Sequence, residues 1–226
     1  MSSADDSLSR QYAENAKRLM AELGVVSEAE LPKFWRDTSL EPEARAKACV
    51  AAGFLRMKDA MPIMIELANN EIAGVAWGAA HALALIGSRA ATRPLMQIVR
   101  GSMHEPNRNA AINALGRLRD ARAEGLLCQV VTDQAESEST RTFAACALMN
   151  PHNPKRATVY LLRALDDPSA HVRWQALSTL GSTGIRDTAE AIRKCLSDQA
   201  VVPGLPPEEA TVAWAAENAL GNLLGT

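Results

Sequence analysis

One segment of this chain recurs in similar form at a second place, without insertions or deletions. This repetition limits the folds that the chain can adopt. His171–Ile192 reads HVRWQALSTLGSTGIRDTAEAI, and Val75–Leu95 reads VAWGAAHALALIGSRAATRPL. Further copies align when Gly181 is taken as a reference, and the equivalent positions are Gly53, Ala84, Gly116, Met149, Gly181 and Gly221. Self-similarity at a period of roughly 20–50 residues indicates an array of stacked repeats.

Each copy begins with a helical pattern of small apolar residues. Five residues before every reference position stands an alanine: Ala48, Ala79, Ala111, Ala144, Ala176 and Ala216. Apolar residues at this spacing fall on one face of a helix. Because a larger side chain between closely packed helices would cost about 1–3 kcal/mol, the alanines indicate close contact with a neighbouring helix. We expect Ala79, Ala111, Ala144 and Ala176 to be almost fully buried.

The second half of each copy also predicts a helix. Its apolar positions are Met64, Leu67, Leu95, Ile98, Leu127, Val130, Leu161, Ala164, Ile192 and Cys195. Aromatic residues make up only 4% of the chain, and no β-branched alternation indicates a strand. A pair of helices cannot bury its apolar faces alone, so the pairs must stack. The sequence therefore predicts an all-α fold in which each repeat has a first and a second helix.

The motif Asp166-Asp167-Pro168, followed by VRWQALSTLG from Val172 to Gly181, carries a family resemblance. It resembles the HEAT-like repeat of the phycobilisome-lyase type, in which an Asp-Pro turn leads to Val-Arg, an alanine-rich helix and a closing Leu-Gly. The resemblance implies a right-handed α-solenoid of about six helical hairpins, the last of them half a repeat.

Two regions are expected from these patterns. Residues 1–40 do not match the repeat and predict an N-terminal helical cap, in which Ser27 and Glu30 form a capping box. Residues 41–226 are expected to form the repeat array as a single continuous domain.

Charge and hydropathy limit the partners of the chain. The formal net charge is −2, which does not favour nucleic acid or an anionic membrane. The longest apolar run, Ala73–Gly87, is interrupted by His81 and is shorter than the roughly 20 residues that span a bilayer. The N-terminus lacks the apolar core of a signal peptide. We expect a cytoplasmic protein without membrane contact.

The reactive side chains form no recognisable catalytic or metal-binding pattern. Cys49, Cys128, Cys146 and Cys195 include no Cys-x-x-Cys pair and are expected to be buried thiols. His104-Glu105 is the only His-Glu pair, whereas deoxyhypusine hydroxylase, an iron enzyme built from the same repeat, carries several. We therefore expect no catalytic residue, no metal and no cofactor.

Three tryptophans, Trp77, Trp174 and Trp214, share one position on first helices, opposite the buried face. In one interpretation the insertion Val201–Pro207 or a neighbouring helix covers Trp174 and Trp214. In the other, the indoles form a partner surface or a site of self-association. A HEAT-like DNA glycosylase uses tryptophans in a basic groove, but first helices usually form the convex side, which disfavours such a groove here.

Arginine also recurs on the first helices, as Arg45, Arg108, Arg141 and Arg173. The resemblance implies that these arginines pair with acidic residues in the turns between repeats. Asp166 and Glu138 are the candidate partners.

Second helices usually line the concave side of such an array, where partners bind. One polar residue per repeat points away from the apolar face of each second helix: Glu66, Gln97, Gln129, Arg163 and Lys194, with Arg93 and Arg100 beside them. This set predicts a ladder that binds a protein or peptide, although an ordinary solvated helix face would show the same pattern.

These observations favour a non-enzymatic scaffold for protein–protein interaction that binds its partner along the concave face. The alternative is an enzyme or enzyme subunit of the HEAT-like lyase or hydroxylase type. A nucleic-acid-binding HEAT-like protein is a third possibility that the charge disfavours.

Overall fold

A computed structural model describes residues 3–149 and 151–225 of the chain. These residues form thirteen α-helices and several short 3-10 turns, with one isolated bridge between Val201 and Thr211. The predicted all-α fold is confirmed. No helix within these residues is both long enough and apolar enough to cross a bilayer. The chain divides into two compact units, Met1–Leu118 and Arg119–Thr226.

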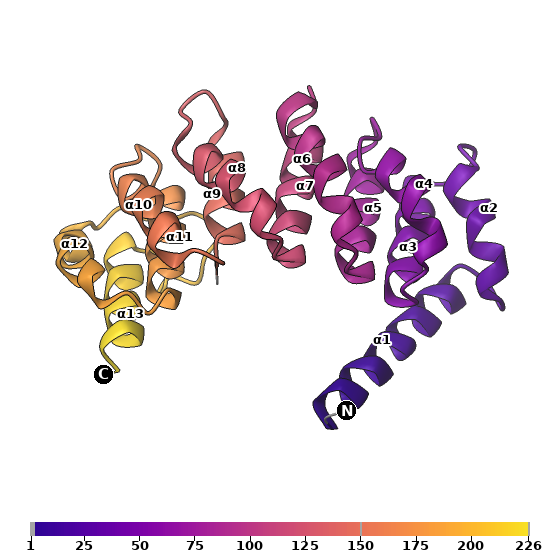
Figure 1. Cartoon of the computed structure of the whole chain (residues 1–226), viewed down its shortest axis with the longest axis horizontal. Helices are drawn as coiled ribbons and strands as arrows, with labels where there is room; N and C mark the ends of the chain where they lie inside the picture. Colours follow the sequence, from indigo (N-terminus) through magenta and orange to yellow (C-terminus); the bar gives the residue numbers. More distant parts are fainter. Residues whose placement is uncertain (1–2, 150, 226) are drawn as a thin grey trace. The chain divides into compact units, whose positions relative to one another are not determined.

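Unit 1 is a double layer of helices with two additional helices at its N-terminal end (Figure 1). First helices α3 (Pro42–Phe54), α5 (Ala73–Ile86) and α7 (Glu105–Leu118) pack side by side. Second helices α4 (Met61–Leu67) and α6 (Thr92–Gly101) pack against α5 and α7. Each pair thus buries its apolar face against the next pair, as the periodicity predicts.

The N-terminal helices α1 (Ser3–Glu22) and α2 (Leu31–Arg36) both pack on α3. The ring of Tyr12 on α1 meets the ring of Phe54 edge to face, with 5.3 Å between the centroids. Before α2, the side chains of Ser27 and Glu30 form the predicted capping box. These contacts cover the first repeat of unit 1. The predicted boundary between residues 1–40 and 41–226 remains a prediction.

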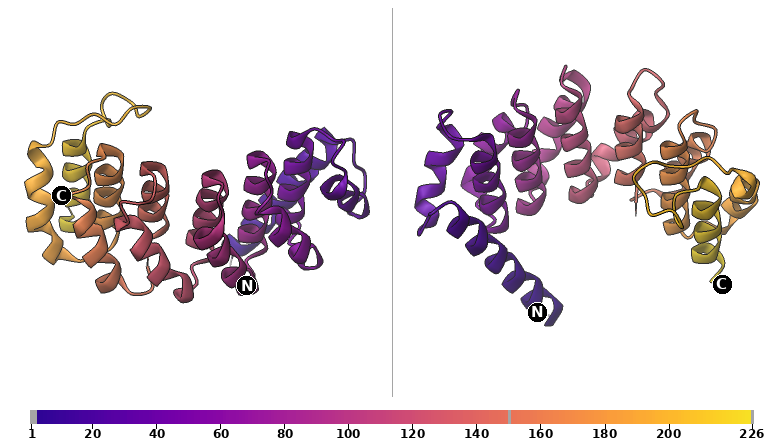
Figure 2. Two further views of the ribbon diagram at one scale, coloured as in Figure 1. Left: turned by 90° about the horizontal axis from the view of Figure 1, so that it is seen from above. Right: turned by 180° about the vertical axis from the view of Figure 1, so that it is seen from behind.

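Unit 2 repeats the same arrangement (Figure 2). First helices α9 (Glu138–Ala147), α11 (Ala170–Ser182) and α13 (Val212–Leu224) pack in sequence, α9 on α11 and α11 on α13. Second helix α8 (Ala121–Thr132) packs on α9 and on α10 (Pro154–Ala164), α10 packs on α11, and α12 (Ala189–Lys194) packs on α13. An extended insertion precedes α13, which is the first helix of the last repeat. The bridge between Val201 and Thr211 joins the two ends of this extended segment.

Small residues let the first helices come into backbone contact. Ala79, Ala111, Ala144 and Ala176 are 0% exposed, which confirms the expectation from the sequence. In α11, a Cβ added to Gly181 would lie 2.8 Å from the Cα of Ala219 in α13. Gly125 in α8 is different, because a Cβ there would meet only Nη1 of Arg156, at 3.9 Å. Packing therefore requires glycine at position 181 but not at position 125.

The same substitution should have opposite effects at these two sites. Gly181→Ala should lower the free energy of unfolding by about 1–3 kcal/mol, because the helices must separate. Gly125→Ala should raise it by about 0.5–1 kcal/mol, because alanine loses less backbone entropy in a helix. Urea unfolding followed by circular dichroism tests this pair. Equal shifts of the two midpoints in one direction would contradict the packing described for α11 and α13.

Candidate functional site

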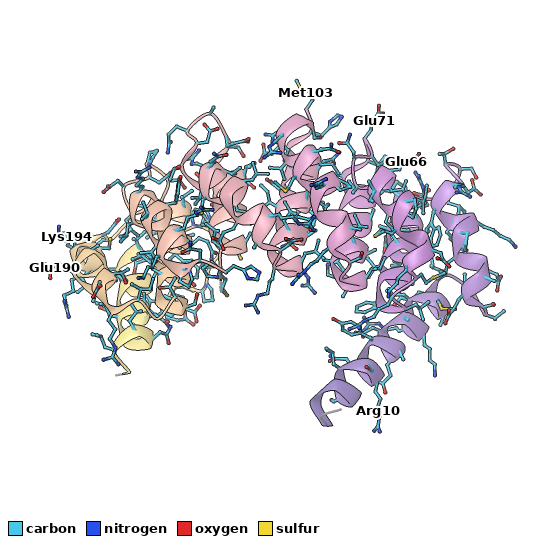
Figure 3. The ribbon with its side chains drawn as sticks, viewed as in Figure 1. Arg10, Glu66, Glu71, Met103, Glu190 and Lys194 are labelled. Carbon is cyan, nitrogen blue, oxygen red and sulfur yellow. The ribbon has the colours of Figure 1, made fainter. Side chains whose placement is uncertain are left out.

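The polar residues predicted to form a ladder all lie on second helices, and all are exposed: Glu66 on α4, Arg93, Gln97 and Arg100 on α6, Gln129 on α8, Arg163 on α10 and Lys194 on α12. Figure 3 shows the side chains of Glu66 and Lys194 at the surfaces of their own units. The exposure agrees both with a binding surface and with a solvated helix face. The ladder therefore remains a prediction.

Two of the three predicted tryptophans lie together in unit 2. The indoles of Trp174 on α11 and Trp214 on α13 are stacked, with ring centroids 6.1 Å apart and planes inclined by 7°. The indole N–H of Trp174 donates to the carbonyl oxygen of Glu209, 2.9 Å away in the loop that joins the insertion Val201–Pro207 to α13. This hydrogen bond favours the interpretation that the insertion covers the pair. Trp77 lies on α5 of unit 1 and is half-buried.

The arginine at position 141 forms a buried ion pair in unit 2. Its Nε lies 2.8 Å from Oδ2 of Asp167, and its Nη2 lies 3.0 Å from Oδ1. The predicted partners, Asp166 and Glu138, were wrong. Asp167 is turned inward because it also accepts from the backbone N–H of Ser169. Asp166 is exposed, and Glu138 instead pairs with His171.

The equivalent arginines also bind oxygen atoms outside their own helices. Arg173 donates from Nε to Asp198 and from Nη1 to the carbonyl oxygen of Asp167, both at 2.8 Å. In unit 1, Arg45 donates to the carbonyl oxygen of Trp35, and Arg108 donates to that of Ser102. Arg45 therefore holds its first helix to α2, and the other three arginines hold theirs to turns, so we assign all four a structural role.

Burial and hydrogen bonding act in opposite directions on Asp167. Burial alone would raise the pKa of this carboxyl group, but hydrogen bonds from Arg141, Ser169 and Gln134 lower it below the ordinary value. The carboxylate therefore stabilises the folded chain above the pKa of the unfolded state, near 3.9. This contribution is lost as the pH falls through the lower pKa of the folded state.

Asp167→Asn should leave Arg141 buried without its charge partner and should lower the free energy of unfolding by about 3 kcal/mol at neutral pH. The matched variant Asp198→Asn should cost about 1 kcal/mol or less, because the Arg173–Asp198 pair is more exposed. Thermal melts at several pH values measure both effects. The stability of Asp167→Asn should also change less than that of the unmodified chain between pH 5 and pH 2. Equal losses in the two variants would contradict this assignment.

The cysteines do not form a reactive centre. Burial raises the pKa of the Cys49 thiol to about 12 and that of Cys128 to about 11, so both are protonated at neutral pH. The prediction of buried thiols was wrong for Cys146, which is exposed on α9, and for Cys195, which is half-buried. Among residues 3–149 and 151–225, no group of three histidine, cysteine, aspartate or glutamate side chains is arranged to hold a metal ion.

Unit 1 contains a hollow of about 800 Å³ that the sequence did not predict. It is lined by Ala13, Lys17, Met20, Val26, Ser27, Glu28, Ala29, Leu55 and Met57. The lining is mostly apolar, and Val26 is 93% exposed. Lys17 and Glu28 supply one charge of each sign, so the hollow does not favour a ligand of either charge.

Unit 2 carries a more distinctive surface on α10, which we call the α10 surface and define as Arg156, Val159, Tyr160 and Arg163. Helix α10 has three basic residues and no acidic residue. Val159 is 49% exposed between the two arginines, and the guanidinium of Arg163 lies over the ring of Tyr160, 5.5 Å from its centroid. Arg163 could be predicted from the repeat register, but Val159 could not, because in sequence an exposed valine of a helix cannot be told from a buried one.

The chain matches the family of HEAT repeats over residues 36–102, a segment that includes α3 to α6. It is 27% identical over 192 residues to the bilin biosynthesis protein PecE of Mastigocladus laminosus, covering 83% of this chain and 70% of the relative. This match includes most of both units. The match to HEAT repeats and the similarity to a bilin biosynthesis protein confirm the resemblance that Asp166-Asp167-Pro168 and Val172–Gly181 indicated.

Solved structures show the same fold. One is a chain of the complex of CpcE and CpcF of phycocyanin lyase from Nostoc sp. PCC7120, with a TM-score of 0.59 and 21% identity over 72% of this chain and 98% of that one. Another is an archaeal HEAT-like repeat protein from Thermococcus onnurineus NA1, with a TM-score of 0.53 and 12% identity over 97% of each chain. At these identities the likeness concerns the fold alone.

These comparisons correct the functional prediction. The sequence favoured a non-enzymatic scaffold, but a relative that aligns with 83% of this chain is a bilin biosynthesis protein. The scaffold prediction was therefore wrong, and the alternative of an enzyme or enzyme subunit is better supported. The error arose because the repeat pattern specifies a stacked fold without specifying what its surface binds.

Proposed function

We propose that this chain, a HEAT-repeat protein, is a subunit of a bilin-handling enzyme of the lyase type. The observation that carries the proposal is the similarity to PecE, which extends over both units. A match confined to one or two repeats would support only the fold. A match across both units supports a shared use of the array.

We infer that the chain acts together with a second protein. The phycocyanin lyase of Nostoc is a complex of two proteins, CpcE and CpcF. In unit 2, Arg141 and Arg173 of the first helices are bound to turns, whereas the basic side chains of second helix α10 are exposed. Such an arrangement suits a subunit that binds and orients a substrate, because holding reactants in the correct geometry can itself lower a reaction barrier by several kcal/mol.

Binding of a bilin by the purified full chain is the first test. Biliverdin, an open-chain tetrapyrrole, should bind with a dissociation constant in about the micromolar range, which corresponds to roughly 8 kcal/mol. Its visible absorption should change on binding, and tryptophan fluorescence should be quenched in parallel. A designed armadillo repeat protein of similar size is the control for nonspecific uptake by a helical array. Identical titrations for the two proteins would contradict the proposal.

Affinity capture from the native extract tests the second part of the proposal. The tagged chain should retain a second repeat protein in a stable ratio, and the captured complex should transfer a bilin to an acceptor protein. Transfer is read as colour that remains with the acceptor after denaturation. Failure of the complex to bind or transfer a bilin would exclude a lyase role.

A further inference from the structure

We propose that the α10 surface binds the two carboxylates of an open-chain tetrapyrrole, with Arg156 and Arg163 each contacting one of them. This inference rests on the proposed function and assigns the ligand contact to one helix of unit 2. Bilins carry two propionate groups on an extended apolar skeleton. A complementary surface therefore presents an apolar contact with one cation on each side of it.

The two arginines supply this charge pattern. They stand seven residues apart on α10, which corresponds to about 10.5 Å along the helix axis. Both are exposed, and Lys155 adds a third positive charge at the start of the helix. Guanidinium groups can bind carboxylates through two parallel hydrogen bonds, which gives strength and orientation.

Acidic groups near this helix offset its three positive charges only in part. Glu124 of α8 is 6% exposed and accepts a hydrogen bond from the backbone N–H of Asn153. Asp167 is occupied by Arg141. Exposed Asp166 lines one hollow together with Arg163, and exposed Asp133 stands between Thr132 and Gln134, which line the same hollow. Helix α10 itself contributes no carboxylate.

An apolar contact lies between the two cations. Val159 is 49% exposed, although a polar residue at such a position would cost nothing in packing. Tyr160 follows it, and its ring supports the guanidinium of Arg163. Aromatic and aliphatic groups beside arginines suit a flat conjugated ligand better than a fully hydrated anion.

Gly125 on the neighbouring helix α8 keeps this side of α10 open. A glycine inside a helix costs about 0.5–1 kcal/mol relative to alanine. Unlike Gly181, Gly125 is not required by close packing, and the nearest atom to a Cβ there would be Nη1 of Arg156. The missing side chain leaves space beside the guanidinium, as a ligand contact at Arg156 would need.

Helix α6 of unit 1 provides an internal comparison. Arg93 and Arg100 are also seven residues apart and exposed on a second helix. Between them α6 has half-buried Met96 and exposed Gln97, where α10 has exposed Val159 and half-buried Tyr160. The two helices therefore share the arginine spacing and differ in the apolar contact.

The test compares charge reversals on these two helices in the full chain. Arg156→Glu with Arg163→Glu should weaken biliverdin binding at least about tenfold, since the loss of one charged hydrogen bond can account for that factor. Arg93→Glu with Arg100→Glu changes the net charge equally and should shift the dissociation constant less than twofold. Val159→Asp should also weaken binding. Circular dichroism and thermal melts must show that every variant is folded.

The ligand can be altered in parallel. Biliverdin dimethyl ester, whose carboxylates are masked, should bind the unmodified chain weakly and should not distinguish it from the Arg156→Glu, Arg163→Glu variant. Binding that is unchanged in this variant, or weakened equally by both double variants, would overturn the assignment while the proposed function stands. If the unmodified chain binds no biliverdin, the proposed function and this assignment both fail. If the α10 variant retains biliverdin but loses the captured protein, the surface belongs to a protein partner and the assignment is wrong.

Discussion

Backbone contact between neighbouring first helices is the constraint on which the other features of both units depend. In unit 1, a Cβ at Gly78 would come 2.8 Å from the carbonyl oxygen of Ala46, and in unit 2 a Cβ at Gly181 would come equally close to the Cα of Ala219. At this separation an arginine on a first helix of unit 2 can reach the turn that precedes the next one, as Arg141 reaches Asp167. A wider spacing would leave these guanidinium groups buried without partners, so the small residues and the ion pairs depend on each other.

The sequence predicted the features that depend on periodicity. The helices, the fully buried alanines and the capping box of Ser27 and Glu30 follow from local spacing and local hydrogen bonding. The partner of Arg141 did not follow, because Asp166 and Asp167 are chemically identical in the sequence. Only the backbone of the turn, where Asp167 accepts from the N–H of Ser169, determines which carboxylate faces inward.

The candidate site was less predictable for the same kind of reason. Exposed arginines on second helices could be found from the repeat register, and Arg163 was among them. The importance of Val159 and Gly125 depends on what lies next to each residue in space. Helices α6 and α10 show this clearly, because their arginines have equal spacing and their intervening side chains do not. Function in such a protein is carried by small departures from the repeat.

The contacts that hold each unit together also bear on how the chain reaches its fold. Arg141 and Asp167 are 26 residues apart in sequence, Arg173 and Asp198 are 25 apart, and Asn107 reaches the carbonyl oxygen of Asn70 across 37. Each of these separations is about the length of one repeat, so these contacts form between segments that are close in sequence. Low contact order of this kind is associated with folding in microseconds to milliseconds. Nucleation can then begin at any adjacent pair of repeats and spread outward, so that the terminal helices are the last to become ordered and the first to fray.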